Sequence, residues 1–262
     1  MASHKFFSIT VLTTLLSLCA NALSRTEYNC SSQKVNLTIY YDTLNPYCEE
    51  FIVYELPKAF ELELMHIINL RLVPYGNAYI QEPNNTISCQ NGPAECYLNS
   101  IEACVISIWP DVVCSYFIIS LTVMQNKHFK FIHCVAWQNL GRLQLKEDAW
   151  KSCSKITMLS DKPVSNCYKS GYAKKLLLRY ANETKHLDPP HTNVPWVVIN
   201  KRPLYYDYKN FVSYVCEAYQ GHPKPSACTT PIFSSAKKSN STHLHIYYYL
   251  LHLMSCAAFL IN

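Results

Sequence analysis

Apolar and polar residues alternate along Val35–Tyr41, and this pattern predicts a β-strand with one buried face. Polar residues and a proline interrupt the pattern at Asp42–Pro46. From Cys48 to about Asn69 the apolar residues recur every three to five positions, which predicts a helix. Pro57 falls inside this pattern and is expected to kink or divide the helix. Leu70–Tyr75 is a second short apolar run, so strand, helix and strand form a predicted right-handed βαβ unit.

A second block of strand and helix patterns lies towards the C-terminal end. Val194–Asn200 is strongly β-forming, Leu204–Tyr206 predicts a second short strand, and Tyr208–Tyr219 predicts a closing helix. Between the two blocks, periodic apolar runs and most of the cysteines predict a disulfide-bound helical insertion over about residues 84–180. Two β-α halves around such an insertion predict an α/β fold, a thioredoxin-like domain with a disulfide-rich helical insertion.

The N-terminal end has the layout of a secretory signal peptide. A lysine precedes the mostly apolar run Phe6–Leu18, and Ala20 and Ala22 offer small residues for cleavage. This run is shorter than the ~20 apolar residues that span a bilayer. Residues 1–22 are therefore predicted to be removed, and the folded domain is predicted to occupy residues 23–233.

The C-terminal end, residues 234–262, combines small residues, a polar spacer and the apolar, aromatic run Ile246–Ile261. This layout fits a glycosylphosphatidylinositol attachment signal, which would attach the protein to a membrane. His252 and the tyrosines Tyr247–Tyr249 make the tail less apolar than such signals usually are, and an interfacial tail outside the folded domain is the alternative.

Five Asn-x-Ser/Thr triplets accompany the signal peptide, and in a secreted chain these are acceptors for N-linked glycans. They begin at Asn29, Asn36, Asn84, Asn182 and Asn240. The sequence therefore predicts a glycoprotein of the secretory pathway, located outside the cell or in a lysosome or vacuole.

Composition excludes several classes of function. The net charge is +5 with 16% charged residues, and no run of Lys or Arg is long enough to indicate nucleic-acid binding. The chain has five glycines, and they form neither GxGxxG nor GxxxxGK, the loops that cradle dinucleotides and nucleoside triphosphates. Sites for dinucleotides and nucleoside triphosphates are therefore not expected.

The segment Cys89–Cys104 reads CQNGPAECYLNSIEAC and closely resembles the signature C-Q-H-G-x2-E-C-x2-N-x4-C of the gamma-interferon-inducible lysosomal thiol reductase family. Asn91 stands where the family has histidine. The matching residues are Cys89, Gln90, Gly92, Glu95, Cys96, Asn99 and Cys104. The resemblance runs from about Val35 to Cys228, and the segment HTNVPWVVIN resembles the plant members in particular.

The resemblance implies a thiol–disulfide oxidoreductase that acts on protein disulfides or small thiols, in acidic compartments and without a cofactor beyond its own cysteines. The family reads C-P-x-C at the first strand-to-helix turn, where this chain reads Asn45-Pro46-Tyr47-Cys48. Cys48 matches the second active-site cysteine, and Asn45 matches the first in place only. Asn is a good helix N-cap and Pro a good first helical residue, so the turn is retained while the exposed nucleophile, normally activated by the helix N-terminus, is replaced.

Pro195 precedes the β run WVVI and, by the same resemblance, matches the cis-proline whose loop binds the substrate's extended chain. The alternative is an ordinary trans proline at the start of a strand, since cis is only ~5% of X–Pro bonds.

Cysteine counting bears on the same turn. Of 13 cysteines, Cys19 falls in the signal peptide and Cys256 in the tail, and removing both leaves an odd number. An odd count in a secreted protein indicates a free thiol or an intermolecular bond. Cys48, without a partner at position 45, is the candidate for the free thiol, and the others are expected to form bridges, Cys216 with Cys228 among them.

Other site chemistries fit the sequence less well. The cysteines from Cys89 to Cys114 lack the paired spacing of a zinc site, so bridges are favoured over metal. His133-Cys134 could suggest a Cys–His protease, but no sequence typical of one surrounds it. The loop His186–His191 is interpreted as a rigid turn, and Glu49 and Glu50 as a solvated pair that complements the helix dipole. No metal site is predicted.

Three hypotheses for function remain. The first is a thiol–disulfide oxidoreductase that retains single-thiol chemistry through Cys48. The second is a catalytically inactive, disulfide-stabilised module that binds peptides without reducing them. A structural cell-surface glycoprotein, suggested by the C-terminal tail, is compatible with either. The exposure and pKa of Cys48 distinguish the first from the second.

Overall fold

The computed structural model describes residues 34–110, 126–140 and 149–229. The predicted signal peptide, the C-terminal tail and the sequons at Asn29 and Asn240 lie outside these residues. The chain divides into two units after His222. The described part of the second unit holds a short 3₁₀ turn, Ser226–Cys228, and the sheets and α-helices all lie in the first.

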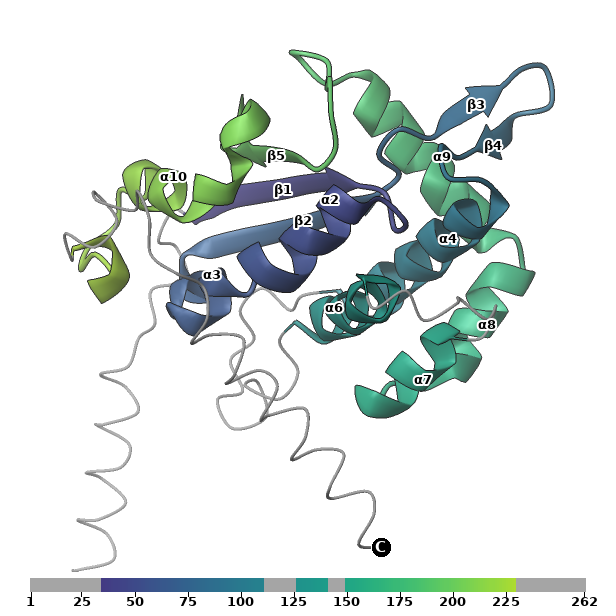
Figure 1. Ribbon diagram of the computed structural model, residues 1–262, viewed down its shortest axis with the longest axis horizontal. Coiled ribbons are helices and arrows are strands. Elements are labelled where there is room, and N and C mark those ends of the chain that lie inside the picture. Colours follow the sequence, from purple (N-terminus) through teal and green to yellow (C-terminus); the bar gives the residue numbers. More distant parts are fainter. Residues whose placement is uncertain (1–33, 111–125, 141–148, 230–262) are drawn as a thin grey trace, which may run out of the picture. The chain divides into compact units, whose positions relative to one another are not determined.

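A mixed four-stranded sheet is the centre of the first unit (Figure 1). β1 runs parallel to β2, from Val35 opposite Ile68 to Tyr41 opposite Pro74. β1 is antiparallel to β5, with Tyr40 opposite Trp196, and β5 is antiparallel to β6. In spatial order the strands are β2 (Ile68–Pro74), β1 (Val35–Tyr41), β5 (Trp196–Ile199) and β6 (Arg202–Pro203).

The connection between β1 and β2 is helical, as the periodicity predicts, but it is divided. Leu56 donates its N–H to the carbonyl of Phe51, an i→i+5 bond that widens the helix into a π turn. Pro57 then caps the next helix, which confirms that it divides the segment. The pieces are α2 (Pro46–Glu50), η1 (Phe51–Glu55), α3 (Lys58–Glu61) and η2 (Leu64–His66).

The region between β2 and β5 confirms the predicted disulfide-bound helical insertion. It begins with a hairpin that the sequence did not indicate, β3 (Tyr79–Gln81) and β4 (Thr86–Ser88). Three bridges fasten the helices: Cys89–Cys96, Cys104–Cys167 and Cys134–Cys153. The helices are α4 (Pro93–Ile108), α6 (Lys127–Leu140), α7 (Ala149–Ile156), α8 (Asp161–Lys169) and α9 (Tyr172–Lys185). Among the helices of the described ranges, none has the length and apolar character needed to cross a membrane.

The predicted strand at Leu204–Tyr206 is wrong. Tyr205 has a positive φ of 50° and begins the 3₁₀ helix η3 (Tyr205–Asn210), which leads into α10 (Phe211–Ala218). The second strand of this half is instead the two-residue β6, which follows a tight turn at Asn200 and Lys201, both with positive φ. Left-handed backbone at two successive non-glycine residues is rare, so the local sequence did not indicate the turn.

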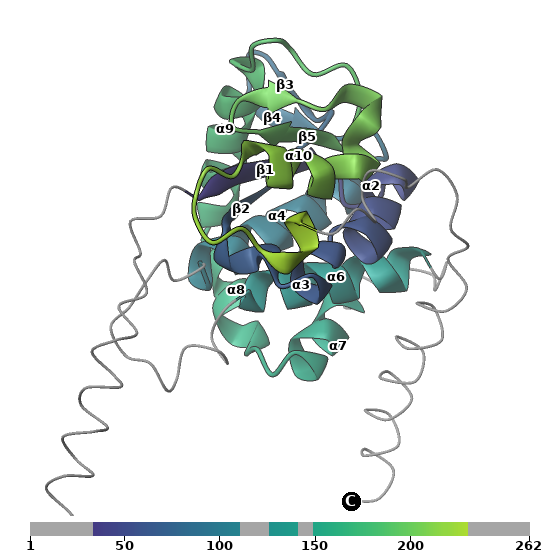
Figure 2. The same cartoon turned by 90° about the vertical axis from the view of Figure 1, so that its left-hand side faces the viewer.

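The two faces of the sheet differ in burial. On one face of β1 the side chains of Val35, Leu37, Ile39 and Tyr41 are nearly inaccessible to solvent. α4 lies next to β2, and α10 next to β5 (Figures 1 and 2). Phe51 of η1 makes edge-to-face ring contacts with Tyr208 and Phe211. The opposite face is partly open and holds a groove of about 480 Å³ around Asn36, Arg71 and His186.

Gly76, just after β2, packs against the carboxylate of Asp42. Its φ is +46°, and a Cβ there would lie 2.1 Å from Asp42 Oδ1. Gly76→Ala is therefore expected to lower the free energy of unfolding by about 2 kcal/mol or more, because left-handed strain and overpacking add. Gly171→Ala is the matched control, since Gly171 also has positive φ but nothing within 4 Å. Urea unfolding checks this, and equal losses in the two variants would contradict it.

Candidate active site

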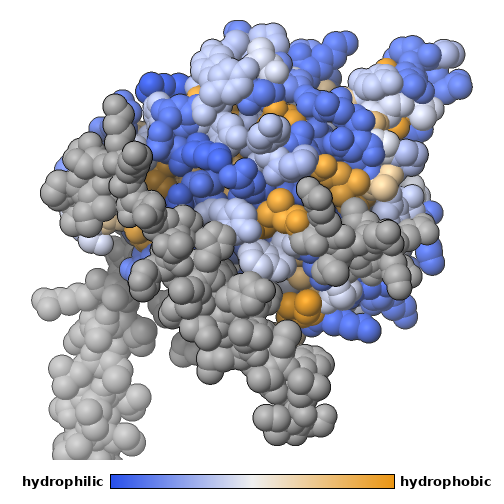
Figure 3. Space-filling model, viewed as in Figure 1, coloured by the Kyte–Doolittle hydropathy of each residue, from blue (hydrophilic) through white to orange (hydrophobic). Residues whose placement is uncertain are grey.

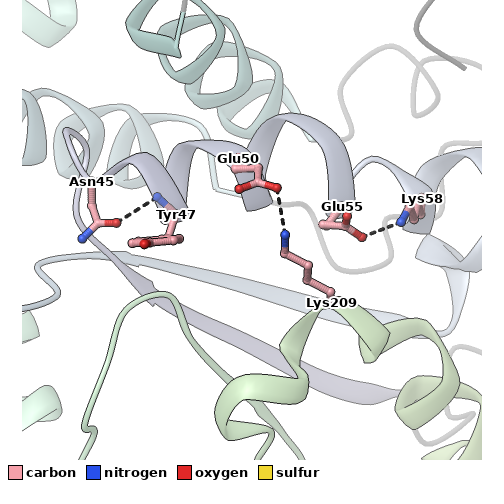
Figure 4. Close-up of polar contacts among 6 residues, drawn as sticks. All are labelled: Asn45, Tyr47, Glu50, Glu55, Lys58 and Lys209. Atoms are coloured by element: carbon pink, nitrogen blue, oxygen red, sulfur yellow. Dashed lines mark hydrogen bonds and ion pairs between the residues drawn. The ribbon is translucent and has the colours of Figure 1, made fainter. Parts of the chain in front are cut away.

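Asn45 caps the helix that follows β1. Its backbone is extended (φ −90°, ψ 120°), and its Oδ1 accepts the N–H of Tyr47 at 3.0 Å and that of Cys48 at 3.4 Å (Figure 4). Pro46 occupies the first helical position. The sequence-based placement of this turn is therefore confirmed, and the N–H groups that could stabilise an anion at the helix start are used by an amide oxygen.

Asn45→Ala is expected to lower the free energy of unfolding by about 1 kcal/mol, because it removes the acceptor for two helical N–H groups. Asn45→Ser should retain most of the stability, since a hydroxyl oxygen can also cap a helix. Chemical denaturation of both variants measures the difference. An alanine variant as stable as the wild type would show that the cap contributes nothing here.

Cys48 lies in the first turn of α2 and is fully buried, at 0% exposure. It is the free cysteine of the described part of the chain, as the odd count predicts. Burial raises the pKa of its thiol well above the ordinary value, and the nearby carboxyls of Asp42 and Glu49 raise it further, against a lowering backbone hydrogen bond from Asp42. The thiolate is therefore disfavoured in the closed structure.

Pro195 lies at the same end of the sheet as this turn. The Val194–Pro195 peptide bond is cis, as predicted. Because Trp196 pairs with Tyr40, Pro195 sits beside the end of β1, from which the chain turns into α2. A role for this proline in holding a substrate stays a prediction.

Exposed tyrosines and an ion pair belong to α2 and η3. Tyr47 is 65% exposed, and Tyr206 of η3 is also exposed. Lys209 of η3 donates to Glu50 at 2.8 Å and links the two elements (Figure 4). The described surface on this side is mostly hydrophilic, with only small hydrophobic areas (Figure 3).

Four carboxyl groups are buried near Cys48, and burial raises the pKa of each. The pKa is about 7 for Asp42, about 7 for Glu49 and about 8 for Glu102, and it is also raised for Glu95. Glu102 accepts a 2.6 Å hydrogen bond from the hydroxyl of Tyr41. At mildly acidic pH Asp42, Glu49 and Glu102 are therefore largely neutral.

Glu49 corrects one sequence-based interpretation. It was expected to be solvated together with Glu50, but it is only 5% exposed. The side chain of Asn139, on α6, hydrogen-bonds its carboxyl, so tertiary packing of the insertion covers this side of α2. Glu50 pairs with Lys209 and remains half-exposed.

The signature segment, Cys89–Cys104, contacts the loop that precedes α2. Gly92, with φ 87°, precedes α4, which carries Glu95 and Asn99 into the interior next to Thr43. Sequence reasoning did not foresee Thr43, Asn77 and Asn139 as parts of the site, since only the fold brings them together. These three residues are uncharged hydrogen-bonding residues outside any motif, so the sequence does not indicate their role in the site.

The cysteines of the insertion form bridges, as expected. Cys89, Cys96 and Cys104 are all oxidised rather than arranged as a zinc site. Cys134 is bonded to Cys153, so it is not the thiol of a Cys–His pair with His133. Cys216 and Cys228 are disulfide-bonded as well, and their predicted pairing with each other stays a prediction. Cys114 lies outside the described residues.

Three of the predicted glycan acceptors lie in the described residues, and all three are exposed: Asn36, Asn84 and Asn182. Asn84 is in the turn of the β3–β4 hairpin, and Asn36 faces the groove on the open side of the sheet. Their modification stays a prediction.

The chain is similar to known thiol reductases in sequence. Residues 36–157 match the family model described as gamma interferon inducible lysosomal thiol reductase (GILT). It is 36% identical over 221 residues to the gamma-interferon-responsive lysosomal thiol protein of Arabidopsis thaliana, covering 83% of this chain and 85% of that one. It is 31% identical over 203 residues to the gamma-interferon-inducible lysosomal thiol reductase of Mus musculus, covering 76% and 73%.

The fold is similar to solved structures of DsbA type. BdbD from Bacillus subtilis superposes with a TM-score of 0.50 over 73% of this chain and 90% of that one, at 10% identity. Oxidised DsbA from Mycobacterium tuberculosis gives a TM-score of 0.50 over 74% and 87%, at 14% identity. The fold is thus thioredoxin-like, as the strand and helix pattern predicts.

Proposed function

We propose, because the chain belongs to the gamma-interferon-inducible lysosomal thiol reductase family, that it is a thiol–disulfide oxidoreductase of the secretory pathway that works through one active-site thiol, Cys48. Its substrates are disulfide-bonded proteins and small thiols. Outside the cell or in a lysosome or vacuole it would meet such substrates, and the relatives from Arabidopsis thaliana and Mus musculus are named as lysosomal proteins.

One observation supports this proposal above the others. Cys48 is a free thiol in the first turn of α2, while the other described cysteines are oxidised. The scaffold around it is intact, with Asn45 as the cap and the cis peptide bond at Pro195 beside it. The single thiol is therefore in a position from which it can exchange with a disulfide once the turn opens.

The chemistry takes three thiol–disulfide exchanges. The Cys48 thiolate attacks a substrate disulfide, the substrate S–S bond breaks, one sulfur joins Cys48, and the other leaves as a thiolate that takes up a proton. A small external thiol then attacks the mixed disulfide, which releases Cys48 and forms a disulfide with the substrate sulfur. A second external thiol completes the reduction, so both electrons come from small thiols. Asn45 has no sulfur and cannot resolve the intermediate within the chain.

A buried Cys48 with a raised pKa is the state expected of the catalytically inactive alternative, so single-thiol exchange requires a conformation in which this thiol is accessible. In the closed structure the Cys48 sulfur is inaccessible and its pKa is raised, so exchange requires local opening of the first turn of α2. We expect slow turnover that depends on the concentration of external thiol. Slow, thiol-dependent turnover is what a family member with one active-site thiol and no second active-site cysteine would show.

The test is the rate of disulfide reduction in insulin, with glutathione as the small thiol, for the wild type and Cys48→Ala. The wild type should show a slow, glutathione-dependent rate above background, and Cys48→Ala should show none. Equal rates in the two proteins would mean that the chemistry does not use Cys48. A folded wild type without activity would overturn the proposal in favour of a module that binds peptides without reducing them.

A further inference from the structure

Thr43 has backbone groups that the sheet and the helix leave without partners. Thr43 lies two residues after Tyr41, the last residue of β1, and two residues before the cap Asn45. It is only 3% exposed. Its N–H donates to Asn99 Oδ1 at 3.2 Å, and its carbonyl accepts from Asn139 Nδ2 at 3.0 Å. Two amides from two different helices therefore hold one residue of the loop, where buried backbone groups require partners.

The hydroxyl of Thr43 adds a third contact. It donates to the backbone carbonyl of Glu95 at 3.3 Å. The carboxylate of Glu95 in turn accepts from Asn91 Nδ2 at 2.5 Å. Thr43 is thus fixed on one side by α4 and on the other by α6.

Asp42, the preceding residue, is held by a parallel route. Its carboxylate accepts the backbone N–H of Asn77 at 3.1 and 3.2 Å. The side chain of Asn77 donates to Gln90 Oε1 at 2.7 Å. Gln90, Glu95 and Asn99 all belong to the signature segment, so its polar residues converge on two consecutive loop residues.

The helices that supply these groups are themselves fixed by disulfides. Cys89–Cys96 joins the start of α4 to the preceding loop, and Cys104–Cys167 joins α4 to α8. Cys134–Cys153 joins α6 to α7. The helix that carries Asn99 is therefore tied to α8, and the helix that carries Asn139 is tied to α7.

Three side-chain atoms of the cluster remain unpaired. Asn99 Nδ2, Asn139 Oδ1 and Glu95 Oε1 are buried without a hydrogen-bond partner in the described part of the chain. Apolar side chains of the same size would avoid this loss of stability, but they would leave the buried N–H and carbonyl of Thr43 without partners. The two amides are therefore retained for their contacts to the loop.

We propose that Asn99 and Asn139 are positioning residues that fix the loop before α2, whose Asp42 backbone hydrogen-bonds the Cys48 thiol, and that their contacts to Thr43 set how often this thiol opens to a disulfide. In this proposal the signature segment fixes the position of the active-site loop. The effect of this positioning on catalysis rests on the proposed function. Its effect on how often Cys48 becomes accessible does not.

The test is the rate at which iodoacetamide alkylates Cys48 in the native protein, followed by peptide mass spectrometry. Asn99→Ala and Asn139→Ala should each raise this rate at least about tenfold, because a buried backbone group loses its partner. The matched controls are Ser100→Ala and Gln138→Ala, at neighbouring positions of the same helices. Ser100 donates to Cys96 within α4, and Gln138 contacts Ser152 and Cys134. The controls should stay within about twofold of the wild type, since their contacts do not reach the loop.

A second measurement separates local opening from general loss of stability. Alkylation through a local opening rises only weakly with urea until the whole domain unfolds. Asn139 is half-buried, so its variant keeps the test usable if Asn99→Ala fails to fold. The proposal is overturned if Asn139→Ala leaves the alkylation rate of Cys48 unchanged. It is also overturned if, at every urea concentration, the alkylation rate changes in parallel with the globally unfolded fraction.

The insulin assay on the same proteins separates this proposal from the proposed function. If the alanine variants expose Cys48 while the wild type and the variants reduce no disulfide, the positioning role stands and the proposed function fails. If the wild type reduces insulin through Cys48 but Asn99→Ala and Asn139→Ala leave alkylation unchanged, the proposed function stands and the positioning role fails.

Discussion

Asn45→Cys is expected to raise the disulfide reductase activity about 100-fold at pH 5, because a thiol at a helix N-terminus has a pKa some two units or more below the usual ~8.5. The N–H groups of Tyr47 and Cys48, which now donate to Asn45 Oδ1, would face the new sulfur. At a pH below both pKa values, each unit of lowering gives tenfold more thiolate.

The new thiol would also change how the mixed disulfide is resolved. Cys48, one helical turn away, could attack it within the chain, and a well-placed intramolecular group acts at an effective concentration far above that of millimolar external thiols. Release of the substrate from the mixed disulfide should therefore depend less steeply on the glutathione concentration than in the wild type. Dithiothreitol or another reductant then restores the dithiol.

Two variants control for this result. Asn45→Ser keeps a cap without sulfur and should show only the wild-type rate. Asn45→Cys combined with Cys48→Ala should accumulate the mixed disulfide when external thiol is withheld, since no second active-site thiol can resolve it. A singly substituted Asn45→Cys protein that folds but is no more active than the wild type would show that the loss of the first cysteine is not what limits turnover.

The second large effect is a loss of stability as the pH rises. Asp42, Glu49 and Glu102 have pKa values of about 7, 7 and 8 in the folded protein. The unfolded chain releases these protons near pH 4, so the folded state binds more protons between about pH 4 and pH 8. Stability contributed by these groups is therefore fully present below about pH 4, declines through this window and levels off above it.

The fall should be on the order of 5 kcal/mol between pH 5 and pH 8, since each unit of raised pKa corresponds to about 1.4 kcal/mol and the groups are coupled and partly screened. Glu102, which is 2% exposed, should contribute most. Urea unfolding at a series of pH values measures the curve.

Glu102→Gln tests the origin of this effect. The amide oxygen can still accept from the Tyr41 hydroxyl, but the side chain no longer ionises. The variant should match the wild type near pH 5 and exceed its stability at pH 8. Glu61→Gln, at an exposed position, should leave the curve unchanged. A wild type that is most stable at pH 8 would contradict the assignment.

The sequence predicts much of the scaffold because local patterns govern it. Alternation in Val35–Tyr41 reflects one buried face of β1, and Asn45 followed by Pro46 defines the start of α2. The odd number of cysteines predicts one free thiol beside the bridges of the insertion, and the family resemblance at the first turn places that thiol at Cys48. The cis bond at Pro195 agrees with the family resemblance.

The interior of the site could not be predicted because it depends on packing between distant segments. Glu49 is buried because Asn139, 90 residues later, lies against it. The contacts of Asn99 and Asn139 to Thr43 span 56 and 96 residues. Tyr205 is a good strand former by type, but tertiary contacts, including its ring against Trp196, place it in a 3₁₀ helix with positive φ.

The most direct test of the account is whether Cys48 in the native wild type exchanges with a small disulfide. The protein would be incubated with glutathione disulfide without denaturant, and the adducts located by peptide mapping. We predict a slowly formed glutathione adduct on Cys48 that added thiol removes and that Cys48→Ala lacks. If Cys48 stays unmodified in the native protein but reacts readily once the chain is unfolded, the thiol is structural and single-thiol catalysis is contradicted.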